Sequence, residues 1–210
     1  MKKYTVFHLF NSSVVSGPEK AVIPGLKFLS PSHFQTQAVF LQEARLSPHQ
    51  QQGPIEYARQ IGVPVRAVTV RKRLDLKAVS ELRAMLKINN VAILHCHDAK
   101  ATVYGLLAIR GTRIKIVSTH HGAIRHGFFN NLYVHIFHFF LRWVDMIINV
   151  SQWDKDYLAK TIATYAPKQL NKMQLLPNGI EAPKSIPSAQ GFAILGKILA
   201  SKNLPIPKRP

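Results

Sequence analysis

Val91-Ala92-Ile93-Leu94-His95-Cys96-His97-Asp98 is an apolar, branched run that passes directly into polar residues. Apolar runs that pass into polar strings recur further along the chain, and segments with a helical pattern separate them. The other polar strings are Thr119-His120-His121-Gly122, Asn149-Val150-Ser151 and Pro177-Asn178-Gly179-Ile180. A repeated strand, polar loop and helix predicts an α/β fold with a doubly wound, mostly parallel, Rossmann-like sheet.

The polar strings are expected to lie close together in the folded chain. In an open parallel sheet, the loops after the carboxyl ends of the strands line the ligand crevice. Histidine, serine, asparagine and glycine predominate in these loops. Such residues suit a hydroxylated or phosphorylated ligand, so the sequence predicts one binding site at this edge of the sheet.

Apolar runs and helical periodicity outline the individual elements. Strands are expected over residues 4–10, 37–41, 65–70, 91–94, 114–118, 146–150 and 173–176. Helices are expected from Pro18, with a break at Pro24, and over residues 55–61, 75–88, 99–109, 129–143 and 153–161. In the 129–143 helix, the period assigns His135, His138 and Arg142 to the face opposite the core, and it assigns to the core Leu132, Tyr133, Ile136, Phe137, Phe140 and Leu141.

Length and composition favour one domain followed by a tail. A chain of 210 residues is long enough for a full core and too short for two large domains. No acidic residue follows Glu181, and prolines punctuate the remainder. We therefore expect a Rossmann-like domain over residues 1–181, and a linker with the start of another domain over residues 182–210.

The chain is strongly basic. It carries 28 Lys and Arg residues against 10 Asp and Glu residues, a formal net charge of +18, which should attract anionic partners. Arg71-Lys72-Arg73 is the only tight basic triplet and no nucleic-acid motif accompanies it, so no nucleic-acid partner is expected. An anionic membrane surface or a lipid-linked acceptor fits the charge, and is favoured over charge that serves solubility alone.

The sequence also bears on the compartment. No signal-peptide core follows Met1, and no apolar run reaches the roughly 18 residues of a transmembrane helix. Cys96 is the single cysteine, which fits a reducing compartment. We expect a cytoplasmic protein that is peripheral on the inner face of the membrane.

In this order and spacing, the polar strings resemble those of the amino-terminal half of family 4 glycosyltransferases. Ser16-Gly17-Pro18-Glu19-Lys20 adds to the resemblance, which extends over about residues 1–203. The family consists of retaining sugar transferases built from two Rossmann-like domains, an architecture called the GT-B fold. The resemblance implies a nucleotide-sugar donor as substrate, with no cofactor and no metal.

The resemblance continues into the opening of the family's second domain. There the family has a strand, then Gly-Arg-Leu, three variable residues and Lys-Gly. Here Gly196-Lys197 and Lys202 stand at the corresponding positions. Lys197 keeps the positive charge of the arginine that it replaces, and Asn203 replaces the second glycine. The resemblance implies that nearly all of the nucleotide-sugar domain is missing. We therefore expect a chain that is inactive alone, either a truncated transferase or one half of a split enzyme completed by a separate chain.

Candidate contacts to the donor come from both ends of the sequence. Ser16 and Gly17 precede a helix whose free N–H groups could hold a phosphate, although an ordinary capped helix start has the same pattern. Lys197 and Lys202 match cations that face the donor diphosphate in the family. Asn178 and Gly179 tolerate positive φ and form a turn, which the resemblance assigns to the interdomain cleft.

The string at residues 95–98 allows several interpretations. His95 and His97 alternate along a strand end and point the same way, which resembles half of a metal site. A His-x-His metallohydrolase is therefore a rival interpretation, but the acid-poor sequence offers few further ligands. Otherwise His95 packs under the sheet while His97 and Asp98 cap the next helix. The resemblance assigns this loop to the acceptor side, with His97 and Asp98 as acceptor contacts.

The string at residues 119–122 holds the catalytic candidate. A neutral imidazole can accept a proton from an attacking hydroxyl near pH 7. His121 matches a histidine that related lipid-sugar transferases place beside the acceptor or transition state, and Thr119 and His120 are candidate acceptor contacts. Alternatively, the two histidines only satisfy backbone groups of the loop.

These patterns lead to a functional expectation and its alternative. The chain is expected to be the acceptor-side domain of a retaining glycosyltransferase that acts on a glycolipid or a cell-envelope polysaccharide precursor. The alternative is a noncatalytic module that binds a sugar or phospholipid.

Overall fold

The computed structural model describes residues 3–29, 33–121 and 136–178. The chain divides into two units, residues 1–179 and 180–210, and the described residues all lie in the first. The domain boundary expected after residue 181 therefore stays a prediction. Among the described helices, none is both long and apolar enough to cross a membrane.

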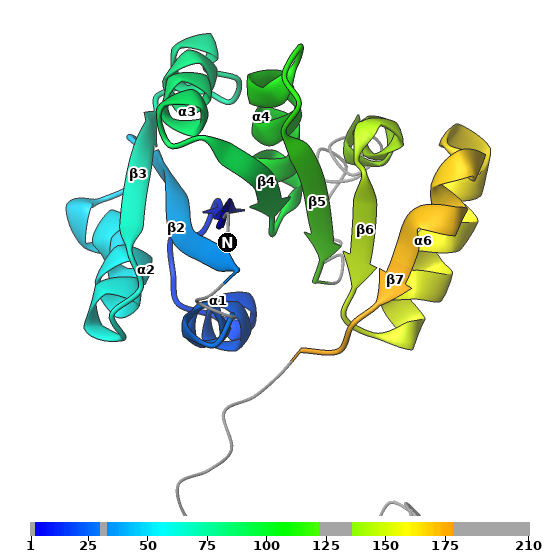
Figure 1. The fold of residues 1–210 in the computed structure, drawn as a ribbon, viewed down its shortest axis with the longest axis horizontal. Coiled ribbons are helices and arrows are strands. Elements are labelled where there is room, and N and C mark those ends of the chain that lie inside the picture. Colours follow the sequence, from blue (N-terminus) through cyan, green and yellow to red (C-terminus); the bar gives the residue numbers. More distant parts are fainter. Residues whose placement is uncertain (1–2, 30–32, 122–135, 179–210) are drawn as a thin grey trace, which may run out of the picture. The chain divides into compact units, whose positions relative to one another are not determined.

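A single parallel sheet forms the centre of the first unit (Figure 1). Its strand order is β3-β2-β1-β4-β5-β6-β7, and every neighbouring pair runs parallel. The strands are β1 (Tyr4–Phe10), β2 (Phe34–Glu43), β3 (Val65–Val70), β4 (Val91–Cys96), β5 (Lys115–His120), β6 (Met146–Asn149) and β7 (Met173–Leu175). The order reverses between β1 and β4, so the fold is a Rossmann-like, doubly wound sheet with its switch point there.

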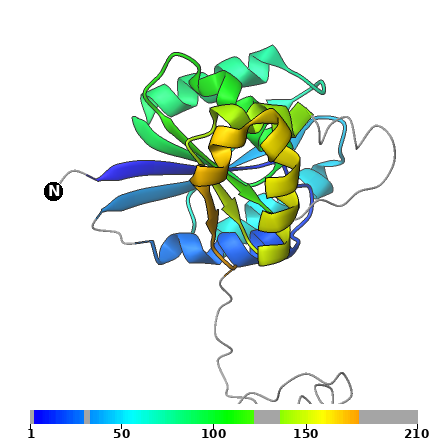
Figure 2. The same ribbon diagram turned by 90° about the vertical axis from the view of Figure 1, so that its right-hand side faces the viewer.

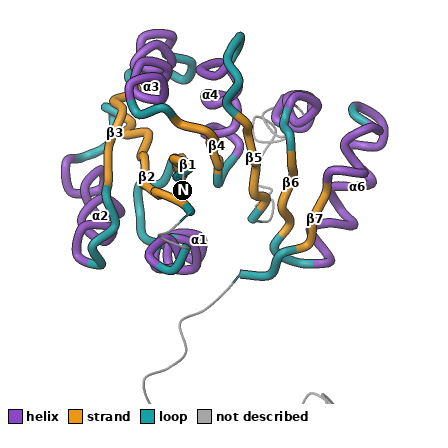
Figure 3. Tube along the Cα trace, in the orientation of Figure 1, coloured by secondary structure: helices purple, strands orange, loops and turns teal. Residues whose placement is uncertain are grey.

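Helices cover both faces of this sheet. The helices with both ends in the described part of the chain are α1 (Gly17–Val22), α2 (Pro48–Gln60), α3 (Leu76–Ile88), α4 (Ala99–Ile109) and α6 (Gln152–Tyr165), with the 3-10 helices η1 (Pro24–Lys27), η2 (Leu141–Trp143) and η3 (Pro167–Lys172). Helices α1 and α2 lie on one face, and α3 and α4 lie on the other (Figures 1 and 2). A segment of loop follows the carboxyl end of each strand (Figure 3).

Two apolar clusters form the core, one on each face. Phe10, Phe40 and Ala58 belong to the cluster under α1 and α2. Phe7 and Leu94 belong to the larger cluster under α3 and α4. Because side chains alternate along a strand, the neighbouring Leu9 and Phe10 of β1 point into different clusters. Strands buried on both faces explain the continuous apolar runs in the sequence.

The observed elements agree with the expected ones in most places. Residues 4–10, 65–70 and 99–109 have the expected bounds, and α1 stops before Pro24, where η1 begins. Proline has no N–H to continue an α-helix, which accounts for the break. Helix α2 starts earlier than expected, at Pro48 in its first turn, and it continues through Pro54, although proline has no N–H for the interior of a helix.

One expected helix face is wrong. The described part of the 129–143 segment begins at residue 136, and in it Phe137 and Leu141 are buried as predicted. His138, however, is fully buried rather than opposite the core, while Ile136 is 42% exposed. The buried positions 137, 138 and 141 are spaced i, i+1 and i+4, so the buried stripe is rotated toward His138. Outside the described residues lie Leu132, Tyr133 and His135.

Candidate functional site

Four histidines gather at the carboxyl ends of the central strands; we call them the histidine cluster. They are His8, His95, His97 and His121. His8 of β1 and His95 of β4 are direct cross-strand partners, because the register of the two strands pairs them. His97 follows β4, and its backbone N–H donates to the carbonyl oxygen of Leu9. His121 follows β5.

Ring contacts join the members of the histidine cluster. His8 Nδ1 lies 3.0 Å from His97 Nε2, and the other ring nitrogen of His97 lies 3.5 Å from His121 Nε2. The rings of His95 and His97 are 4.2 Å apart between centroids. Phe10 stacks on His97 at 4.4 Å, which fixes the plane of that ring. His97 is therefore the central member of the histidine cluster.

Burial controls the protonation of these rings. It is the main cause that lowers the pKa of His8 and His97 well below the ordinary histidine value. It lowers the pKa of His95 to about 4, and that of His121 in the same direction. All four rings are therefore neutral at pH 7, and each can donate through one nitrogen and accept through the other.

A cleft of about 280 Å³ opens beside the histidine cluster. Of the residues proposed from the sequence, it brings together His97, Thr119, His121 and Asn178. Thr119 Oγ1 lies 2.6 Å from His95 Nε2, which orients both side chains. In the described part of the chain, His121 Nδ1 is buried and has no hydrogen-bond partner. His8 Nε2, on another residue that lines the cleft, is likewise buried without a partner among the described residues.

His120 does not line this cleft. Its side chain points away from that of His121, as successive residues at a strand end do. It stacks on Phe137, and its Nδ1 lies 3.7 Å from a carboxylate oxygen of Asp154. Burial lowers the pKa of His120, although Asp154 acts in the opposite direction. This geometry gives His120 packing contacts, and its proposed contact with an acceptor stays a prediction.

Asp98 and Ser16 are already engaged by the protein. Asp98 is the N-cap of α4: its carboxylate accepts from the N–H of Ala101 at 2.8 Å and from that of Asn11 at 2.6 Å. The Glu19 carboxylate accepts from both the N–H and the hydroxyl of Ser16. A phosphate at Ser16 and Gly17 would require Glu19 to release these donors. The acceptor role of Asp98 and the phosphate role of the Ser16 loop therefore stay predictions.

Three proposed residues lie outside the described part of the chain, namely Gly179, Lys197 and Lys202. Conversely, sequence reasoning missed His8. This residue sits inside an apolar strand, where a lone histidine gives no local signal. Only the pairing of β1 with β4 brings it to His95, and the sequence alone does not reveal that register.

The histidine cluster also bears on the rival metal-site interpretation. His8, His95 and His97 present nitrogens within 4.8 Å of one another, close enough to be considered as ligands. In a tetrahedral site with bonds of about 2.1 Å, however, ligand nitrogens lie roughly 3.4 Å apart. A ring nitrogen that takes part in the His8–His97 or the His95–Thr119 contact would have to give up that contact to bind an ion. The expectation that this site holds no metal therefore stays a prediction.

Comparisons with known proteins identify the family. A model of the family described as Glycosyltransferase Family 4 matches residues 37–182. No curated protein matches the sequence.

Several solved structures share the fold. Anabaena Alr3699/HepE in complex with UDP-glucose is 14% identical with a TM-score of 0.67, over 95% of this chain and 50% of that one. A glycosyltransferase from Rickettsia africae ESF-5 is 16% identical with a TM-score of 0.63, over 98% of this chain and 51% of that one. The lipopolysaccharide outer core galactosyltransferase WaaB, in its apo form, is 13% identical with a TM-score of 0.63, over 88% of this chain and 49% of that one.

The chain thus spans about half the length of each of these structures. At such identities the likeness establishes the fold alone. That fold is one Rossmann-like half of a GT-B glycosyltransferase.

Proposed function

The chain belongs to glycosyltransferase family 4, and we propose that it forms the acceptor-side half of a retaining transferase. In this proposal the enzyme moves a sugar from a nucleotide-sugar donor to a glycolipid or polysaccharide precursor. The observation that carries the proposal is the cleft that holds His97, Thr119, His121 and Asn178 at the carboxyl edge of the sheet. Ligands of doubly wound folds bind at this edge.

His121 is the proposed catalytic residue. Its neutral ring and its unpartnered Nδ1 in the described structure suit a group that receives a proton from the acceptor hydroxyl. His97 and Thr119 line the same cleft and are proposed acceptor contacts. The donor is a substrate, and its diphosphate leaving group is stabilised by cations and N–H groups. Ser16, Gly17, Lys197 and Lys202 are proposed for that role.

Donor binding requires a cleft between two Rossmann-like halves in this proposal. We therefore expect the chain alone to bind UDP- and GDP-sugars very weakly and to neither transfer nor hydrolyse them. Isothermal titration with a panel of these sugars measures the binding, and product analysis measures the turnover. Turnover that appears when a separate second-half chain is added supports a split enzyme. Tight binding and turnover by the chain alone would contradict the proposal.

A peripheral position on an anionic, cytoplasmic membrane face is the second part of the proposal. Phe139 and Trp143 are 41% and 53% exposed. The Arg142 guanidinium lies 3.8 Å from the centre of the Phe139 ring and 5.4 Å from that of Trp143. Trp143 also borders a cleft of about 560 Å³ that Arg110, Arg113 and Lys115 line. Aromatic rings beside several cations suit the interface of an anionic bilayer.

Vesicle flotation tests the membrane contact. Each cation near an anionic bilayer contributes about 1 kcal/mol of electrostatic attraction, and salt screens this attraction. Binding to anionic vesicles should therefore weaken as salt is added. The double variant Phe139→Ser/Trp143→Ser should bind less. Phe28→Ser/Trp153→Ser is the matched control, because Phe28 and Trp153 are 75% and 68% exposed at other places. Equal binding to neutral vesicles, or equal losses in the two variants, would refute this contact.

A further inference from the structure

A second cleft, which we call the basic cleft, lies at the carboxyl ends of β2 and β3. Its volume is about 230 Å³. Its walls carry the cations Arg45, Arg71, Lys72, Arg73 and Lys100, with Glu43 as their acidic neighbour. These residues come from the ends of two strands, the loop after β3 and the first turn of α4. Segments far apart in sequence therefore bring basic residues to the border of one hollow.

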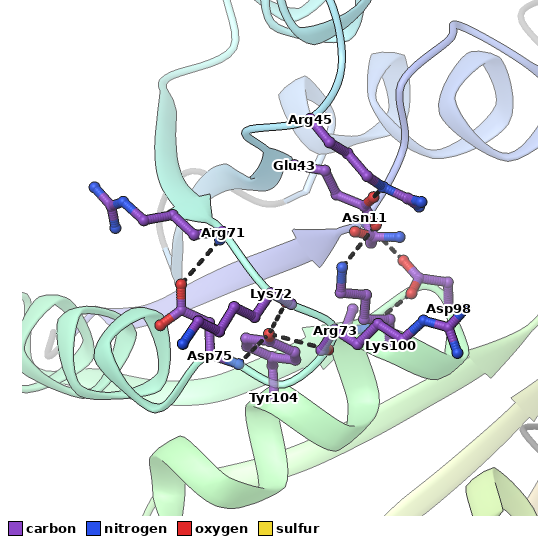
Figure 4. Close-up of polar contacts among 11 residues, drawn as sticks. Asn11, Glu43, Arg45, Arg71, Lys72, Arg73, Asp75, Asp98, Lys100 and Tyr104 are labelled. Carbon is purple, nitrogen blue, oxygen red and sulfur yellow. Dashed lines mark hydrogen bonds and ion pairs between the residues drawn. The ribbon is translucent and has the colours of Figure 1, made fainter.

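Glu43 neutralises only part of this charge. Its carboxylate bonds to Lys100 Nζ at 2.6 Å and to Arg45 Nε at 2.5 Å (Figure 4). Burial alone would raise the pKa of Glu43, but the bonds from Lys100 and Arg45 lower it. Glu43 is therefore ionised at neutral pH and holds Lys100 in place, while a second carboxylate, that of Asp75, interacts with Arg71 beside the basic cleft.

The loop that carries Arg71, Lys72 and Arg73 is fixed by its backbone. The Arg71 N–H donates to the Asp75 carboxylate at 2.9 Å, and the Asp75 N–H donates to the Tyr104 hydroxyl at 2.8 Å. That hydroxyl lies 3.4 and 3.3 Å from the carbonyl oxygens of Lys72 and Arg73, to which it donates (Figure 4). Tyr104 is buried. Because these contacts already hold the loop, a ligand would have to order little of its backbone on binding.

An adjoining cleft connects this region with the end of β1. It has a volume of about 250 Å³, shares Glu43 and Arg45 with the basic cleft, and is lined by Asn11 and Ser12. Among the described residues, Asn11 Oδ1 and Ser12 Oγ are buried without a hydrogen-bond partner. The Asn11 N–H binds Asp98, the residue after His97. Unpaired polar atoms and cations thus lie along the sheet edge between the histidine cluster and the end of β3.

We infer that the basic cleft binds a phosphate or diphosphate group. Arginine forks match the geometry of phosphate oxygens, and several cations suit a group with more than one negative charge better than a single carboxylate. The assignment of that group to the acceptor rests on the proposed function. The acceptor would then be an anionic molecule, with its phosphate in the basic cleft and its hydroxylated part toward Asn11 and Ser12.

Binding measured without turnover tests this inference apart from the transferase proposal. The chain is titrated with inorganic phosphate, inorganic pyrophosphate and a water-soluble short-chain phosphatidic acid, at constant ionic strength. The loop variant Arg71→Gln/Lys72→Gln/Arg73→Gln removes three exposed cations and keeps the backbone contacts of the loop. The control Arg59→Gln/Lys160→Gln/Lys168→Gln removes the same charge from α2, α6 and η3. Circular dichroism verifies that both variants fold.

The loop variant should bind these anions at least about 10-fold more weakly, and the control less than about 2-fold. Tighter binding of the phosphatidic acid than of the inorganic anions supports a lipid-borne phosphate, and the reverse order supports a free one. Equal losses of affinity in the two variants would mean that net charge alone explains the binding, and this result would overturn the inference. The absence of measurable binding to all three anions would overturn it as well.

Discussion

His8 Nδ1 and His97 Nε2 lie 3.0 Å apart, and both imidazoles are buried. One of the two nitrogens donates a proton and the other accepts it when both rings are neutral. Protonation of both rings would place two N–H donors face to face and leave two buried charges side by side. The contact therefore links the packing at the end of β1 and β4 to the protonation of the histidine cluster.

The free energy of unfolding should fall as the pH is lowered from about 7 to 5. The folded-state pKa values of His8, His95, His97 and His121 lie below the unfolded value of about 6.5, so the unfolded chain binds more protons in this window. Each such histidine contributes a slope of up to roughly 1.4 kcal/mol per pH unit. Urea unfolding at a series of pH values measures the total slope.

Two variants locate the source of this slope. His8→Asn removes one titrating ring and keeps a side-chain nitrogen near Nδ1, so its stability should depend less on pH. His33→Gln changes an exposed histidine that directly precedes β2 and is no member of the histidine cluster, and it should keep the original slope. A stability that is constant between pH 7 and 5, or an unchanged slope in His8→Asn, would contradict the explanation.

Gly105 lets α4 lie close against the sheet. A Cβ at this position would lie 2.8 Å from Cys96 Sγ, 3.0 Å from Leu94 Cδ2 and 3.2 Å from Ile116 Cδ1. Gly105→Ala should therefore destabilise the protein by about 1–3 kcal/mol, despite the better helix propensity of alanine. Thermal and urea unfolding measure the loss.

Gly25→Ala is the matched control, since a Cβ at Gly25 would meet nothing within 4 Å. It should leave stability unchanged or raise it by up to about 1 kcal/mol, because alanine restricts the unfolded chain. If Gly105→Ala were as stable as Gly25→Ala, the close approach of α4 to β4 and β5 would not be a packing constraint.

Local patterns predicted the strands well, and long-range pairing accounts for what they missed. Buried parallel strands are short apolar runs, and β1 and β3 were expected with their observed bounds. The meeting of His97, Thr119 and His121 followed from the rule that strand ends converge. His8 and the basic cleft did not follow, because each depends on which strands are neighbours. His138 was misplaced, because helical period alone does not fix which side of a largely apolar helix faces the core.

Tyr104→Phe should destabilise the protein by about 1–3 kcal/mol. The hydroxyl accepts from the Asp75 N–H and donates toward two loop carbonyls, and phenylalanine would leave that buried N–H without its partner. Denaturant unfolding measures the change, and amide hydrogen exchange at Asp75 should become faster. Tyr4→Phe is the control, because Tyr4 is 53% exposed. Equal stability of the two variants would show that the hydroxyl does not hold the loop.

His121→Ala should lower turnover by roughly 100-fold or more in an enzyme that contains both Rossmann-like halves. The expectation rests on position: His121 lines the cleft, its Nε2 lies beside His97, and its Nδ1 has no hydrogen-bond partner among the described residues. The same change at His33 should leave turnover near the wild-type rate. Circular dichroism and urea unfolding establish whether each variant is folded. A well-folded His121→Ala enzyme with wild-type turnover would remove His121 from the catalytic site, while the fold and the family assignment would stand unchanged.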